Sequence, residues 1–164
     1  MKSPAISLWE SIVNSSRFND FPYKVETTKS GCLLMSPVSN WHGNAQAQIC
    51  INMTKGRKGG EVINECSILT QEGVKVADVA WASDEFIERN GFKTPYPEAP
   101  EICVEVVSPG NTKDEIDQKV NLYLAKGAIE AWVVEIDGGV KFFNKIGQLK
   151  KSNMVKNVKV KRRD

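Results

Sequence analysis

The stretch from Ile102 to Glu135, ICVEVVSPGNTKDEIDQKVNLYLAKGAIEAWVVE, predicts the centre of the fold. It begins with a continuous apolar segment, 102–107, which is typical of a buried strand. A helical pattern follows over about 112–126, and Gly127 is suited to end that helix. A second apolar segment, 131–136, comes directly after it. A strand, a helix and a strand with short connections predict two parallel strands joined by a crossover helix.

Elements predicted on both sides of this unit extend it into a mixed β-sheet flanked by helices. The patterns predict helices over 4–18, 40–53 and 84–90, and strands over 31–35, 61–69, 74–82 and 140–144. The expected fold class is therefore α/β (α+β), in one domain over residues 1–164. A basic tail begins at about residue 146, where valines alternate with lysines. This pattern leaves a final edge strand and a frayed end as open alternatives.

Composition excludes several classes of protein. With 41% hydrophobic and 26% charged residues among 164, the chain is neither disordered nor collagen-like. Its apolar runs fall far short of a membrane span, and it starts without a secretory signal pattern, so we expect a cytoplasmic protein. Four scattered cysteines and a single histidine do not form a zinc motif.

The net charge of +2 hides an asymmetry along the chain. From Lys141 onward there are nine basic residues and one acid, whereas the first 140 residues hold 13 basic and 19 acidic residues. A basic tail on an acidic body is a pattern to test against nucleic acid. A solvated end of the chain would have the same composition.

Two acids inside apolar strands are the most informative residues. Glu105 lies in the segment 102–107 and Asp78 in the segment 74–82, where an uncompensated charge is costly to bury. If the two strands are neighbours, both carboxylates can converge at one end of the sheet. Two convergent carboxylates suit a hard cation such as Mg²⁺. Alternatively, each acid is exposed at a strand end or paired with a lysine.

Lys119 lies near the edge of the buried face of the predicted helix 112–126. From there its amine can reach over the strand end and position a water molecule near a metal. A surface lysine whose stem covers apolar side chains would look the same in sequence.

Several spaced motifs resemble the putative restriction endonuclease family (Uma-type) that is common in cyanobacteria, a branch of the PD-(D/E)XK nuclease superfamily. The motifs are Ala77-Asp78-Val79, Glu105-Val106-Val107-Ser108-Pro109, Lys119, Tyr123, Gly127, Ala131-Trp132-Val133-Val134 and the upstream run 31–42, GCLLMSPVSNWH. They occur in the family's order and span roughly residues 20 to 145. The resemblance implies a restriction-endonuclease-like core.

The resemblance also implies roles for individual residues. Asp78 and Glu105 would be metal ligands together with the backbone carbonyl of Val106, and Lys119 would be the catalytic lysine. Position 107, where the superfamily usually has its lysine, is a valine, and Ala77 replaces the proline of the family's "P-D" pair. The following residues are auxiliary candidates: Glu26, which matches an acid before the first strand, and His42, which either contacts a phosphate or caps and packs a helix.

The activity that these residues imply is Mg²⁺- or Mn²⁺-dependent hydrolysis of phosphodiester bonds in DNA. A module that binds nucleic acid or assembles without turnover is the main alternative, and a hydrolase of small phosphate esters is another. A homodimer is expected because double-strand cleavage usually needs two sites. The basic loop at 55–60 forms either a solvated turn or phosphate contacts, with Lys55, Arg57 and Lys58 as the candidate contacts.

Overall fold

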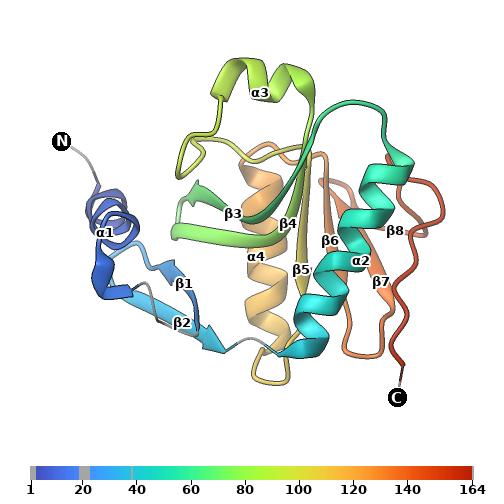
Figure 1. Ribbon diagram of the computed structural model, residues 1–164, viewed down its shortest axis with the longest axis horizontal. Coiled ribbons are helices and arrows are strands. Elements are labelled where there is room, and N and C mark those ends of the chain that lie inside the picture. The colour runs from blue at the N-terminus through green and yellow to red at the C-terminus, as the bar shows by residue number, and fades with distance from the viewer. Residues whose placement is uncertain (1–2, 19–22, 38, 164) are drawn as a thin grey trace.

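Six strands form one mixed sheet in which every strand lies beside its neighbour in sequence (Figure 1). The strands are β3 (Glu61–Thr70), β4 (Gly73–Ala82), β5 (Ile102–Val106), β6 (Glu130–Val134), β7 (Val140–Asn144) and β8 (Gly147–Leu149). All neighbours are antiparallel except β5 and β6, which are parallel. This computed structural model describes residues 3–18, 23–37 and 39–163. The two ends of the predicted domain, residues 1–2 and 164, lie outside the described residues.

Two helices cover opposite faces of the sheet. The crossover helix α4 (Lys113–Ala125) packs on one face through Ile116, Val120 and Tyr123. The long helix α2 (Asn40–Gly56) packs on the other face through Ala45, Ile49 and Met53. A capping box at Thr112 begins α4. The predicted parallel unit of strand, helix and strand is therefore confirmed, as is the mixed α/β class.

The N-terminal segment departs from the prediction. A single helix over 4–18 is wrong, because α1 (Pro4–Val13) ends early and a short 3₁₀ helix, η1 (Ser16–Phe18), follows. Strand β1 (Tyr23–Thr27) was not predicted, and it pairs with β2 (Leu33–Pro37) in a separate two-stranded sheet (Figure 1).

Strand β1 is held against β4 by side chains. The backbone N–H groups of Val74 and Val76 donate to Thr27 Oγ1 and Glu26 Oε1, both at 2.9 Å. Gly73, at φ +101°, allows this close approach, since a Cβ there would lie 2.3 Å from the Thr27 carbonyl oxygen. These contacts bring the β1 side chains beside the middle of the main sheet.

The predicted hairpins and the short helix are confirmed. β3 and β4 pair along almost their whole length, and β7 pairs with β6 across the turn at Asp137 to Gly139. Helix α3 (Asp84–Asn90) starts at its cap Ser83, whose side chain accepts a hydrogen bond from the N–H of Phe86. Within residues 3–18, 23–37 and 39–163, no helix combines the length and apolar character needed to cross a membrane.

The segment of the basic tail in which valines alternate with lysines follows neither predicted alternative. After the short strand β8, residues 150–163 run as irregular chain alongside α2 (Figure 1). The start of this irregular segment is anchored to β6 by the buried carboxylate of Glu130, which accepts hydrogen bonds from Ser152 Oγ and the N–H of Asn153, both at 2.7 Å. Val155, Val158 and Val160 then pack onto the α2 face of the sheet. The tail is thus attached to the core without being a strand.

Candidate active site

Asp78 and Glu105 meet in the centre of the molecule. Strands β4 and β5 pair in antiparallel register up to Val79 opposite Val104, so the next residue of each strand is one of these acids. Both carboxylates are buried, at 0% and 3% exposure. The predicted convergence is therefore present. Both acids also contact Lys24 of β1, and Glu105 contacts Lys119 of α4 as well.

Asp78 is oriented from three sides. Its Oδ2 accepts the N–H of Val106 at 2.6 Å, and its Oδ1 lies 2.6 Å from Lys24 Nζ and 3.1 Å from His42 Nε2. Burial alone would raise its pKa, but the Lys24 ammonium and the His42 contact together outweigh burial and hold the pKa of Asp78 well below its usual range. The group is therefore a permanent anion at neutral pH.

Glu105 is oriented by helix α4. Tyr123 donates its hydroxyl to Oε1 at 2.6 Å, and Lys119 donates from Nζ to Oε2 at 3.0 Å. Complete burial raises the pKa of Glu105 above its ordinary value, although Lys119 and Lys24 oppose the shift. Glu105 and Asp78 therefore differ in proton affinity although they are neighbours.

Glu26 is a third carboxylate of the same cluster. It belongs to β1, rather than preceding the first strand, and its Oε1 lies 2.6 Å from Lys119 Nζ. Burial opposes its ionisation, but Lys119 and Lys24 lower the pKa of Glu26. Lys119 thus lies between two acids from different strands.

Lys24 was missed by sequence reasoning. Its ammonium lies 2.6 Å from Asp78, 3.7 Å from Glu105 and 3.9 Å from Glu26, and its side chain is 7% exposed. Burial disfavours its charge, but the three carboxylates raise the pKa of Lys24. The only available signal was its place two residues before Glu26, which puts both on one face of a strand.

A second group of possible ligands lies on the α2 side of Asp78. Ligand atoms of His42, Glu65 and Asp78 lie within 4.8 Å of one another. His42 Nδ1 is 3.1 Å from Ser108 Oγ, while its buried Nε2 completes no hydrogen bond among the described residues despite facing Asp78. Glu65 accepts a hydrogen bond from Gln46 at 2.6 Å and was also missed by sequence reasoning.

This donor set fits a divalent cation. The carboxylate oxygens are ligands for Mg²⁺ or Mn²⁺, and the unsatisfied His42 Nε2 suits Mn²⁺ in particular. The ammonium of Lys24 lies within 4 Å of three carboxylates, so the electrostatic potential at this position favours a cation. For Val106, the structure shows its N–H on Asp78, so the role predicted for its carbonyl stays a prediction.

An open cleft leads to this cluster. It has a volume of about 530 Å³ and lies between β2, the loop 108–111 and the start of α4. Glu26, Lys75 and Lys119 line it, so the catalytic lysine candidate faces the side from which a substrate can enter. Two exposed apolar side chains, Leu34 and Met35, form part of the opposite wall.

The other predicted contacts lie elsewhere. Lys55, Arg57 and Lys58 lie at or just beyond the C-terminal end of α2, whereas His42 is near its N-terminal end, about 20 Å away along the helix axis. Arg57 packs over the ring of Trp81 at 4.1 Å and donates to the carbonyl of Met154. The structure therefore brings Asp78, Glu105, Lys119, Glu26 and His42 together but separates the basic loop from them.

Known proteins resemble this chain in sequence and in fold. The sequence profile of the Uma2 family, described as "Putative restriction endonuclease", matches residues 19–151. The chain belongs to the Uma2 family. All five clustered residues fall within the matched segment. Membership of Uma2 makes a nuclease acting on nucleic acid the expected class of protein, as the motifs had predicted.

A solved structure supports the fold assignment of this Uma2 protein. A crystal structure from Anabaena variabilis ATCC 29413, described as a putative nuclease belonging to DUF820, superposes with a TM-score of 0.60. The match covers 80% of this chain and 75% of that chain at 15% identity, so it bears on the fold alone. No match was found among curated proteins.

Proposed function

We propose that this Uma2 protein is a Mg²⁺-dependent endonuclease that hydrolyses phosphodiester bonds in DNA. The observation that carries the proposal is the placement of Lys119, whose Nζ lies 3.0 Å from Glu105 and 2.6 Å from Glu26 at the edge of the cleft. Metal-assisted phosphate hydrolysis needs carboxylates that bind the metal ion and a cationic group that acts on the water and the phosphate. Here both lie together at an edge that is open to solvent.

Asp78 and Glu105 would hold the metal ion, with Glu65 and His42 as further ligands on the α2 side. A bound Mg²⁺ supplies Lewis acidity toward the phosphate and lowers the pKa of a coordinated water molecule. Asp78 offers a permanently charged oxygen, because its pKa is held low. Burial raises the pKa of Glu105, so protons compete with a metal ion for this carboxylate at a higher pH than they do for an ordinary glutamate.

Lys119 would act on the substrate itself. Its side chain is 18% exposed, whereas that of Lys24 is 7% exposed, so Lys119 is the lysine that a phosphate can reach. Its ammonium would orient the attacking water and stabilise the negative charge that develops on the phosphate oxygens. Tyr123 and the N–H of Val106 would act as positioning groups, since each holds one carboxylate oxygen in place.

The test is cleavage of supercoiled plasmid DNA in Mg²⁺, Mn²⁺ or EDTA. We expect nicking in Mg²⁺ or Mn²⁺, none in EDTA, and none with Asp78→Asn or Glu105→Gln. Lys119→Ala should lower the rate by about 10²- to 10⁴-fold, the range for loss of a general acid–base or charge-stabilising group.

Matched controls separate chemistry from folding. Glu72→Gln removes an exposed acid at the β3–β4 turn, and Lys126→Ala removes a lysine at the far end of α4. Both should cleave at the wild-type rate. If the triple variant of Asp78, Glu105 and Lys119 cleaves as fast as the wild type, the proposed site is wrong.

A binding or assembly module without turnover is the second candidate. It is favoured by the charge balance of the site, since Lys24 and Lys119 already compensate most of the charge of Asp78, Glu105 and Glu26. DNA binding in EDTA together with no cleavage in any metal would select this candidate. The homodimer stays a prediction, and light scattering after size exclusion measures it directly.

A further inference from the structure

A basic groove runs between helix α2 and the C-terminal tail, outside the candidate active site. It has a volume of about 840 Å³, with Ile51 and Asn52 of α2 on one wall and the tail on the other. Its cationic side chains are Lys55, Lys156, Lys159 and Lys161. None of the described residues that line it is acidic.

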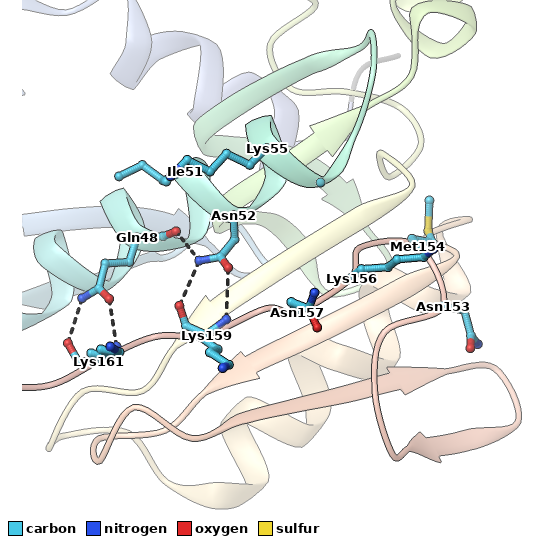
Figure 2. A pocket seen from close by; sticks show the side chains of 11 residues that line it. Gln48, Ile51, Asn52, Lys55, Asn153, Met154, Lys156, Asn157, Lys159 and Lys161 are labelled. Atoms are coloured by element: carbon cyan, nitrogen blue, oxygen red, sulfur yellow. Dashed lines mark hydrogen bonds between the residues drawn. The ribbon is translucent and has the colours of Figure 1, made fainter.

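The tail is held against α2 by amide side chains of the helix. Asn52 donates to the carbonyl of Lys159 at 2.9 Å and accepts its N–H at 3.0 Å, and Gln48 contacts Lys161 in the same way at 2.9 and 2.8 Å (Figure 2). Residues four apart on a helix are about 6 Å apart along the axis, close to the repeat of two residues in an extended chain. The two amide side chains thus form the backbone hydrogen bonds that a partner strand would otherwise supply.

This pairing determines where the tail side chains lie. Val158 and Val160 pack onto the hydrophobic cluster on the α2 face, while Lys159 and Lys161, which alternate with them, are exposed. The lysine backbones are therefore fixed and their ammonium groups are free to contact an anion. None of the four groove lysines forms an ion pair within the described residues.

The groove continues toward the active site. A second hollow of about 560 Å³ shares Gln48 and Lys161 with it and adds Asn40, Arg163 and neighbouring residues. Asn40 directly follows Ser39, which lines the active-site cleft and accepts the N–H of His42. A basic surface thus extends from the end of α2 to the mouth of the cleft.

We propose that this surface, from Lys55 to Arg163, binds the phosphate backbone of the DNA that flanks the scissile bond. This inference rests on the proposed function and assigns the path of its substrate. Four lysines with no acid between them match a polyanion of regular charge spacing, and contacts of this kind carry no base specificity. From Asn40 to Lys55 the surface is about 22 Å long, which corresponds to about seven base pairs.

The experiment measures binding of a fluorescent 30-base-pair duplex by anisotropy in EDTA, between 50 and 200 mM salt. Lys159→Gln/Lys161→Gln removes two groove charges and keeps the backbone pairing. We expect a loss of affinity of at least about tenfold at 50 mM salt and a salt slope that is shallower by about 1.8, since each phosphate contact contributes about 0.9. Lys55→Gln/Lys156→Gln, which removes the other two groove charges, should show the same loss of affinity and the same change in salt slope.

The control is Lys93→Gln/Lys126→Gln, which removes the same charge from surfaces outside both hollows. If this variant loses as much affinity as the groove variants, or if the groove variants bind as the wild type does, the inference is overturned. Plasmid cleavage distinguishes the groove inference from the proposed function. The groove variants should cleave plasmid with a higher KM and an unchanged kcat. A wild type that binds DNA through the groove but never cleaves it would contradict the proposed function alone.

Discussion

Replacing Lys24 tests the electrostatics of the site most directly. The ammonium of Lys24 contacts Asp78 at 2.6 Å and lies within 4 Å of Glu105 and Glu26. Lys24→Gln therefore leaves Glu105 and Glu26 with Lys119, and leaves Asp78 with no lysine within 4 Å among the described residues. The same substitution removes a positive charge from the place where a divalent cation would bind. It should therefore destabilise the metal-free protein and strengthen metal binding.

The loss of stability and the gain in metal affinity can both be estimated from the buried contact of Lys24 with Asp78. Removing one partner of a buried ion pair costs about 3–5 kcal/mol. We take about 3 kcal/mol, because Lys119 remains, and this lowers Tm by about 6–12 °C for a chain of this size. An ammonium about 5 Å from a divalent cation is repelled by about 7 kcal/mol at an effective dielectric constant of 20. Rotation of Lys24 relieves most of this repulsion, so we expect Kd for Mn²⁺ to tighten by at least about tenfold.

The assay combines thermal unfolding and calorimetric Mn²⁺ titration of wild type, Lys24→Gln and the control Lys29→Gln, which changes an exposed lysine in the β1–β2 connection. Lys24→Gln should have the lowest Tm in EDTA. Excess Mn²⁺ should reduce the difference in Tm between this variant and the wild type, because a ligand that binds more tightly stabilises the folded protein more. If Lys24→Gln unfolds at the wild-type temperature in EDTA and binds Mn²⁺ no more tightly, Lys24 does not share the metal site.

Three further predictions concern other ionisable groups. Because burial raises the pKa of Glu105, Mn²⁺ affinity measured by calorimetry should fall as pH decreases through that raised pKa, at a higher pH than for an ordinary glutamate; a flat profile from pH 8 to 5 contradicts this. Glu130→Ala leaves three donors without their acceptor and should lower the free energy of unfolding in urea by about 3 kcal/mol or more. Burial raises the pKa of Cys66 to about 12 and that of Cys103 well above its usual value. Both thiols should therefore react with Ellman's reagent only after unfolding, whereas exposed Cys32 reacts in the native protein.

The central unit of the fold was predictable because its signals are local. The segment 102–134 contains an apolar strand, a capped helix ended by Gly127 and a second apolar strand, and each pattern depends on residues only a few positions apart. Asp78 and Glu105 stood out for a similar reason, because a charge in an apolar strand is costly unless a partner compensates it.

The sequence by itself therefore predicted strands β3 to β7 and helices α2, α3 and α4, and it singled out Asp78, Glu105 and Lys119 as candidate site residues, with Glu26 and His42 as auxiliary ones. Only the tertiary structure decided that β1 forms, since its few apolar residues give a weak pattern and its contacts with β4 come from residues about 50 positions away. Lys24 and Glu26 join the site through that packing alone. The path of the tail was decided in the same way, by hydrogen bonds from Gln48 and Asn52 to backbone more than 100 residues later. Such contacts leave no local pattern, because their free energy depends on parts of the chain that only folding brings together.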